Sequence, residues 1–426
     1  MDQVLYRDFV QILKEELIPA MGCTEPIAVA YAASLARETL GQRPKKVTLW
    51  VSANIVKNVK SVVVPNTNGL KGIEAAAAAG IVAGDASKKL EVIASVSNEQ
   101  VQELSEYLQS ADIQVLTSKS GYIFDIQVAV SAETHSAFVQ IAGSHTNVIC
   151  VKKDNEILYE KEYKEAGQSD QTDRNVLTVG RIVAFADEVE IKDIKEVLDR
   201  QISYNMAIAE EGLRGEWGAS VGKVLLNAYG NDVATLAKAT AAAGSDARMS
   251  GCEKPVVINS GSGNQGMTAS LPVIVYAKKL GASQEMLYRA LLVSNLVTIH
   301  LKTGIGRLSA YCGATSAGCG AGAGISYLYG GKENEIAHTI VNAVAINSGM
   351  ICDGAKPSCA AKIASAVEAG LLGMQMQMQG KEFFGGDGIL VKGVENTIHN
   401  VGLLARKGMI DTDKEIISIM IEQPKC

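Results

Sequence analysis

The charged stretch KKDNEILYEKEYKEAGQSDQTDR, residues 152–174, divides the chain into two parts with different residue patterns. It contains almost no apolar run, so it predicts an exposed connection between two domains. Before it, short apolar runs alternate with turns of Gly, Pro and Asn; after it, apolar residues recur almost throughout at helical spacing. The sequence therefore predicts an α+β domain at residues 1–170, followed by a mostly all-α domain at residues 171–426.

The first part combines both kinds of element. Helices are expected at residues 1–17, 27–41 and 73–79, the last of them rich in alanine. Patterns typical of strands occur at residues 46–51, 59–64, 90–96, 113–117, 123–130, 137–141 and 147–151.

Composition excludes several classes of partner and location. The 426 residues include 40 Lys and Arg against 46 Asp and Glu, a net charge of −6, with no long basic block. This excludes nucleic acid and anionic lipid as expected partners. No long uncharged apolar window predicts a membrane span, and the N-terminus lacks the pattern of a secretory signal, so we expect a cytoplasmic protein. The 41 glycines and the run of alanines at 75–79 predict closely packed helices.

Four Gly-rich or Cys-bearing segments interrupt the helical pattern of the second part, and loops on a rigid scaffold often carry chemistry. They are NSGSGNQG at 259–266, KTGIGR at 302–307, YCGATSAGCGAGAG at 311–324 and SGMICDGAKPSC at 348–359.

The first of these segments matches the G-x-G-x-x-G fingerprint of dinucleotide-binding proteins, but only formally. The helical pattern continues where that fold needs a second strand and an acidic residue. The better interpretation is a loop whose backbone N–H groups, with Ser260, Ser262 and Asn264, bind a small carboxylate. A simple loop before a helix is the structural alternative.

Cysteine spacing supplies a second candidate site. The chain has eight cysteines, of which Cys352 and Cys359 share one loop and Cys312 lies in another. Three neighbouring thiolates repel one another unless a soft metal neutralises them, so this set suits an iron–sulfur cluster with one open position, or zinc. Inert buried cysteines are the remaining alternative.

Two residues of the first domain are candidates for proton transfer. Cys23 lies in GCTEP at the start of a helix, where the helix dipole favours a thiolate. His145 lies in GSHTN at the start of a strand. A packing cysteine and a satisfied core histidine are the structural alternatives.

Together the motifs MGCTEPIA, NTNGLKG, GSHTNV, NSGSGNQG, KTGIGRLSAYCGATSAGCGAGAG and SGMICDGAKPSC resemble the L-cysteine desulfidase family, which is related to the iron–sulfur L-serine dehydratases. The resemblance covers essentially the whole chain, with the first domain similar to the dehydratase β domain and the second to the α domain. It implies that Cys312, Cys352 and Cys359 hold a [4Fe–4S] cluster. A terminal Cys426 that caps the free iron, as in some dehydratases, is a further implication.

The implied reaction is β-elimination of L-cysteine to hydrogen sulfide and aminoacrylate, which hydrolyses to pyruvate and ammonia. The resemblance suggests Cys23 as the base, with His145 as the second candidate. The substrate would be held by Ser260, Ser262 and Asn264 on one side and by Thr24, Asn66, Thr67 and Asn68 on the other. An L-serine or L-threonine dehydratase with the same cluster is the first alternative, and a non-enzymatic thiol or zinc-binding protein is the second. A homodimer is the expected assembly.

Overall fold

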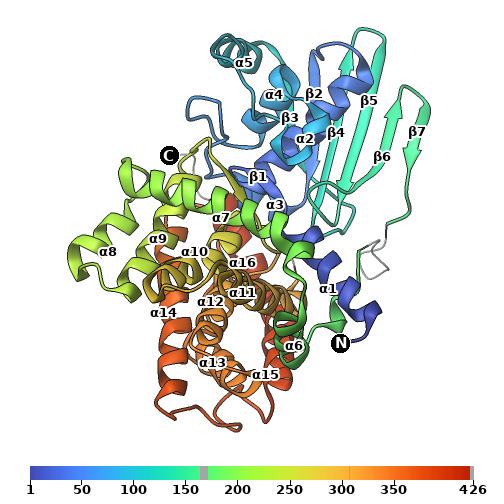
Figure 1. Cartoon of the computed structure of the whole chain (residues 1–426). Coiled ribbons are helices and arrows are strands. Elements are labelled where there is room, and N and C mark those ends of the chain that lie inside the picture. The colour runs from blue at the N-terminus through green and yellow to red at the C-terminus, as the bar shows by residue number, and fades with distance from the viewer. Residues whose placement is uncertain (164–170, 307, 423–426) are drawn as a thin grey trace.

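Alternating apolar side chains on neighbouring strands form the buried face of the N-terminal sheet. Val47, Leu49 and Val51 alternate with more exposed residues, as do Ile126 and Val128 on the adjacent strand. The computed structural model describes residues 1–163, 171–306 and 308–422, and its described strands form a six-stranded sheet in the order β3-β2-β4-β5-β6-β7 (Figure 1). Only the β2–β3 pair is parallel within that described sheet. The strands are β2 (Lys46–Val51), β3 (Asp112–Thr117), β4 (Asp125–Ala132), β5 (His135–Ala142), β6 (Val148–Lys153) and β7 (Glu156–Glu160).

Helices cover the buried face of this sheet. The helix α2 packs on β4 and β5, and α4 packs on α2 so closely that a Cβ at Gly80 would lie 2.0 Å from the Ala30 carbonyl oxygen. The helices of this region are α1 (Gln3–Glu16), α2 (Thr24–Leu40), α3 (Ala53–Val59), α4 (Ile73–Ala83), η1 (Ala86–Glu91) and α5 (Asn98–Ser110). The predicted α+β organisation of the first part is therefore confirmed.

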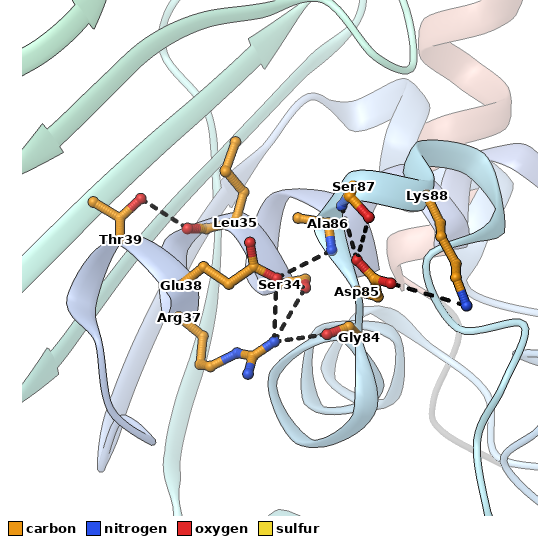
Figure 2. A network of polar contacts seen from close by, with 10 residues as sticks. All are labelled: Ser34, Leu35, Arg37, Glu38, Thr39, Gly84, Asp85, Ala86, Ser87 and Lys88. Carbon is orange, nitrogen blue, oxygen red and sulfur yellow. Dashed lines mark hydrogen bonds and ion pairs between the residues drawn. The ribbon is translucent and has the colours of Figure 1, made fainter.

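A polar network fixes the end of α2 against the turn after α4 (Figure 2). The Arg37 guanidinium donates to the Gly84 carbonyl at 2.6 Å, and the Glu38 carboxylate accepts from the Ala86 amide at 3.1 Å. Asp85 caps η1 by accepting from the Ser87 amide. These contacts satisfy backbone groups that the helix ends leave without intrahelical partners.

Two strand predictions in the first part were wrong, and one strand was not predicted. In residues 59–64, Val59 ends α3 and the residues after it make a single bridge, Val63 to Lys71, whereas residues 90–96 contain the end of the 3₁₀ helix η1 and the turn after it. Both are short apolar runs that are buried without regular pairing, and such runs do not distinguish a strand from other buried chain. Conversely, residues 156–160 lie in the predicted connection but form the exposed edge strand β7, which pairs with β6. Residues 164–170, where the predicted domain boundary falls, are outside the described residues.

The second part is helical, as predicted (Figure 1). Its elements are η2 (Arg174–Val176), α6 (Val179–Glu188), α7 (Ile191–Arg214), α8 (Val221–Tyr229), α9 (Val233–Met249), α10 (Gly263–Leu280), α11 (Gln284–Ile305), α12 (Gly313–Leu328), α13 (Glu333–Ile346), α14 (Cys359–Met378), α15 (Val394–Leu403), the π-helical turn η3 (Leu404–Gly408) and α16 (Ile410–Glu422). No helix within the described residues combines the length and apolar character needed to cross a bilayer.

The Gly-rich segment 311–324, predicted as a loop, is mostly the helix α12, which packs on α10, α11 and α14. A Cβ at Gly318 would lie 2.1 Å from the Ala366 carbonyl oxygen, and one at Gly322 would lie 2.5 Å from the Gly370 carbonyl oxygen. Only glycine lets the two helix backbones touch at these positions. The packing that this contact permits outweighs the low helix propensity of glycine. The segment 302–307 was also predicted as a loop, but its residues up to Ile305 belong to α11.

One short pairing joins the two parts. Strand β1 (Pro19–Met21) is antiparallel to β8 (Pro255–Val257), and the Ile258 amide donates to the Ile18 carbonyl at 3.0 Å. This small sheet places the residues before α2 beside those before α10.

Gly318→Ala tests the close packing of α12. We expect it to destabilise the protein by about 1–3 kcal/mol, because the new methyl group overlaps the α14 backbone. Gly304→Ala is the matched control, since the nearest atom to its new Cβ is 3.5 Å away and alanine favours a helix. Thermal unfolding followed by circular dichroism measures both. A Gly318→Ala protein as stable as the control would contradict the packing argument.

Candidate active site

Four helices of the described chain begin at the wall of one cavity of about 100 Å³. Their first or capping residues are Cys23 for α2, Ser262 for α10, Cys312 for α12 and Cys359 for α14. Helix N-termini present unpaired N–H groups and partial positive charge, so their convergence favours an anionic or electron-rich ligand. The lining residues are Cys23, Glu25, Asn58, Arg248, Ser262, Asn264, Gln265, Lys302, Leu308, Ser309, Tyr311, Cys312, Gly313, Ala314, Cys352, Gly354, Ala355, Cys359, Lys362 and Ile363.

Contacts between the two parts bring these helix ends together. Beyond the β1–β8 pairing, Arg248 Nε donates to the Gly22 carbonyl at 2.9 Å, and Thr24 Oγ1 donates to the Gly261 carbonyl at 2.9 Å. The start of α2 in the first part therefore faces the start of α10 in the second.

The two cysteine-bearing segments are joined by backbone hydrogen bonds. Tyr311 and Ile351 form an antiparallel bridge, the Cys312 amide donates to the Met350 carbonyl at 3.0 Å, and the Cys352 amide donates to the Ala310 carbonyl at 2.6 Å. The predicted loop at 348–359 is confirmed up to Cys359, which begins α14.

Glycine at position 354 lets that loop pass close to α3. Its φ is 92°, and a Cβ there would lie 2.3 Å from the Lys57 carbonyl oxygen. The loop is also fixed by Asp353, whose carboxylate accepts from Lys362 Nζ at 2.5 Å and pairs with Lys356. The position of Cys352 is therefore set by α3 in the first part as well as by α14.

Lysines near the three thiols affect their pKa values, although Lys57 is paired with Asp413 and Lys362 with Asp353. A hydrogen bond from Cys312 lowers the pKa of Cys352 to about 5 in spite of burial, and the charges of Lys57 and Lys302 act in the same direction. The same hydrogen bond and burial raise the pKa of Cys312. Burial also raises the pKa of Cys359. The hydrogen bond between Cys312 and Cys352 thus moves their pKa values in opposite directions.

These side chains fit a soft metal centre. Thiolates are the ligands of iron–sulfur clusters, and nearby lysines reduce the repulsion among them. No group of three or more Cys, His, Asp or Glu side chains within the described residues has the arrangement for a single metal ion. The thiols line a common cavity, and a four-iron cluster is larger than one ion, so its ligands need not converge on one point.

A second polar group lies across the cavity at the start of α2. Cys23 Sγ donates to Glu25 Oε2 at 3.3 Å, and Thr24 Oγ1 donates to the same oxygen at 3.0 Å. His145 Nε2 is 4.0 Å from Glu25 Oε1, beyond hydrogen-bond distance, and has no hydrogen-bond partner among the described residues. Burial opposes ionisation of Glu25, but His145 and Arg248 lower its pKa to about 2.

The expectation that the helix dipole makes Cys23 a thiolate is wrong for this resting arrangement. The side chain is buried and faces the Glu25 carboxylate, and both effects raise the pKa of the thiol well above its usual range. Cys23 therefore holds its proton.

A model of the family described as "Serine dehydratase alpha chain" matches residues 87–418. The chain belongs to this family. It is also similar to UPF0597 proteins: it is 61% identical to one from Desulfitobacterium hafniense (strain Y51), over 98% of this chain and 97% of that protein. A UPF0597 protein of Lachnoclostridium phytofermentans is 50% identical over 98% and 100% of the two chains, and one of Treponema denticola is 44% identical over 99% of each.

The serine dehydratase alpha chain match includes Cys312, Cys352 and Cys359 but begins after Cys23 and Glu25. The resemblance to relatives of the iron–sulfur dehydratases is thereby confirmed. Cys426 lies outside the described residues.

The structure brings together part of the residue set predicted from the sequence. Among the described residues, the predicted ones that line the cavity are Cys23, Ser262, Asn264, Cys312, Cys352 and Cys359. Thr24 contacts Glu25 and the α10 loop, Ser260 donates to Asn259 and lines a neighbouring cavity, and His145 lies behind Glu25.

Asn66, Thr67 and Asn68 are absent from the described lining. Asn66 and Asn68 have φ of 58° and 57°, and Asn66 Nδ2 donates to the Ile93 carbonyl at 2.7 Å. Thr67 Oγ1 donates to the Val64 carbonyl at 2.7 Å. These contacts shape a turn, and a role for the three residues in binding substrate stays a prediction.

The sequence analysis missed Glu25, Arg248, Gln265, Lys57 and Lys302. Glu25 is within a quoted motif, two residues after Cys23, and Gln265 is within the Gly-rich segment. Arg248 and the two lysines lie inside ordinary helices, where only tertiary packing places them at or near the cavity.

Glu25→Gln tests whether the Glu25 carboxylate raises the pKa of the Cys23 thiol in this protein. We expect it to lower the pKa of Cys23, because the carboxylate that raises it is lost, and so to speed alkylation of Cys23 by iodoacetamide at neutral to alkaline pH. Peptide mass spectrometry of the metal-free protein as a function of pH measures the rate. Cys150 on β6 is the internal reference and should not change. An unchanged or slower rate at Cys23 would contradict the coupling.

Proposed function

We propose that the protein is an L-cysteine desulfidase, a carbon–sulfur lyase that converts L-cysteine to hydrogen sulfide, pyruvate and ammonia with a [4Fe–4S] cluster. The observation that carries the proposal is one cavity lined by Cys312, Cys352 and Cys359 on one side and by Cys23 on another. Membership of a serine dehydratase family supports elimination chemistry of this type.

The three thiols would hold the cluster, whose chemistry, when bound, is that of a Lewis acid toward the sulfur of the substrate. The protein's own residues supply the remaining needs of the reaction. The lysines Lys57, Lys302 and Lys362 favour negative charge that develops on departing sulfide. The helix N-termini that surround the cavity act in the same direction.

Cys23 is the proposed base for the Cα proton. Because the pKa of the thiol is raised, its thiolate is a strong base once formed. Glu25, whose own pKa is lowered to about 2, stays ionised and orients the thiol through the 3.3 Å hydrogen bond to Oε2, so the thiol must first lose its proton to another acceptor. Removal of the Cα proton and cleavage of the Cβ–S bond give aminoacrylate and hydrogen sulfide. Water then hydrolyses aminoacrylate to pyruvate and ammonia. His145 is the second candidate, although Glu25 separates it from the cavity.

A [4Fe–4S] L-serine or L-threonine dehydratase is the alternative function, and the family description favours it directly. The residue at position 23 favours the desulfidase, because the resemblance places Cys23 where the dehydratase loop offers serine.

The test of function is product formation by anaerobically purified and reconstituted protein. We expect about four irons per chain, with acid-labile sulfide, and release of sulfide and pyruvate from L-cysteine. Pyruvate from L-serine without sulfide release from L-cysteine would instead establish the dehydratase. Bound zinc, or no metal after reconstitution, would overturn both.

Two cysteine variants separate cluster binding from proton transfer. Cys352→Ser should lose most of the iron, because it removes the thiol whose pKa is lowered to about 5. Cys23→Ala should keep the iron and its visible absorption but lose turnover by at least about 100-fold, the typical contribution of a general base. Cys150→Ala, in β6, is the control for both properties. Full iron in Cys352→Ser would refute the ligand assignment, and an active Cys23→Ala would place the base elsewhere.

A further inference from the structure

Two buried polar atoms in the wall of the cavity have no hydrogen-bond partner among the described residues. They are Nη2 of Arg248 and Oε1 of Gln265. The residues are 2% and 6% exposed. A buried donor or acceptor without a partner is costly, so a native protein that retains two of them in one cavity is expected to satisfy them with a ligand.

Arg248 is oriented by the protein yet keeps donors available. Its Nε donates to the Gly22 carbonyl and its Nη1 to Asn264 Oδ1 at 3.1 Å, so both hydrogen-bond partners are neutral oxygen atoms. A Cβ at Gly263 would lie 2.5 Å from Nε, which shows how closely the start of α10 encloses the guanidinium. A fixed, buried guanidinium with a free N–H edge is suited to a carboxylate.

Glu25 does not use that edge. Its carboxylate accepts from Cys23 and Thr24 and faces His145 on the other side. The Arg248 charge is near enough to lower the pKa of Glu25, but the Nη2 atom stays without a partner in the described chain.

Gln265 presents the complementary atom. Its amide lies across the start of α12, where a Cβ at Gly313 would be 2.7 Å from Oε1. Gly313 directly follows Cys312, so the free acceptor lies between the Arg248 end of the cavity and the thiols. An acceptor in this position suits an N–H donor such as an ammonium group.

We propose that Arg248 and Gln265 form a recognition site for the zwitterion of an α-amino acid, with Arg248 binding the carboxylate and Gln265 accepting from the ammonium group. The substrate side chain then extends toward the Cys312 end of the cavity. The identity of that side chain rests on the proposed function, whereas the recognition of the two backbone charges does not.

The experiment compares three small ligands that have no leaving group and no thiol: L-alanine, propionate and ethylamine. Each is titrated calorimetrically into reconstituted protein under anaerobic conditions. Propionate lacks the ammonium group and ethylamine lacks the carboxylate, so each reports on one half of the site. We expect L-alanine to bind at least roughly tenfold more tightly than either, since hydrogen bonds to charged groups are strong.

Variants should remove these preferences one at a time. Arg248→Gln should abolish the preference for L-alanine over ethylamine but keep the preference for L-alanine over propionate. Gln265→Leu should abolish the preference for L-alanine over propionate but keep the preference over ethylamine. Arg248→Lys, which keeps the charge, should restore part of the first preference. Arg43→Gln, which removes an exposed arginine paired with Glu103, is the control and should bind like the wild type. Iron content and circular dichroism confirm that each variant is intact.

The outcomes separate this inference from the proposed function. Equal binding of the three ligands by wild-type protein would overturn the inference, as would variants that weaken all three ligands equally. The crossed pattern in a protein that releases no sulfide from L-cysteine would support the inference and refute the desulfidase. Sulfide release from L-cysteine with unchanged ligand preferences in both variants would support the desulfidase and refute the inference.

Discussion

The structure depends on the antiparallel pairing of β1 with β8, which joins two regions of different architecture. The pairing is three residues long on each strand, but Met21 leads to Cys23 and Glu25, and Val257 leads to Ser262 and Asn264, all of which line the cavity. The Arg248 bond to Gly22 and the Thr24 bond to Gly261 extend it. This junction brings Cys23 and Glu25 of the first region to the cavity that Cys312, Cys352 and Cys359 of the second region also line.

The pKa values of Cys352 and Cys23, on two sides of the cavity, are shifted in different directions. The hydrogen bond from Cys312, with the charges of Lys57 and Lys302, lowers the pKa of Cys352. At the start of α2, burial and the Glu25 carboxylate raise the pKa of Cys23 although it stands at a helix N-terminus. Position at a helix N-terminus is therefore not sufficient to set the state of a thiol; the nearest full charge and the degree of burial decide it.

Strong periodic patterns made the two-part organisation and most of its elements predictable from the sequence. The cysteines and the α10 residues Ser262 and Asn264 were found because they stand in short, unusual motifs. Arg248 and Lys57 could not be found in this way, since a cation inside a helix usually faces solvent and only tertiary packing buries it. The segment 311–324 was mistaken for a loop because glycine serves both turns and close helix contacts, and the sequence does not show which neighbour approaches.

The contact of α12 with α14 through glycines at 318, 322 and 370 has a consequence for assembly of the site. Cys312 and Cys359 stand at the starts of these two helices, and their backbones touch with no flexible side chain between them. The helices cannot slide or separate without losing many contacts at once. The spacing of these two sulfur atoms is thus a property of the folded chain itself, so a cluster bound there would be assembled on a frame whose dimensions do not depend on it.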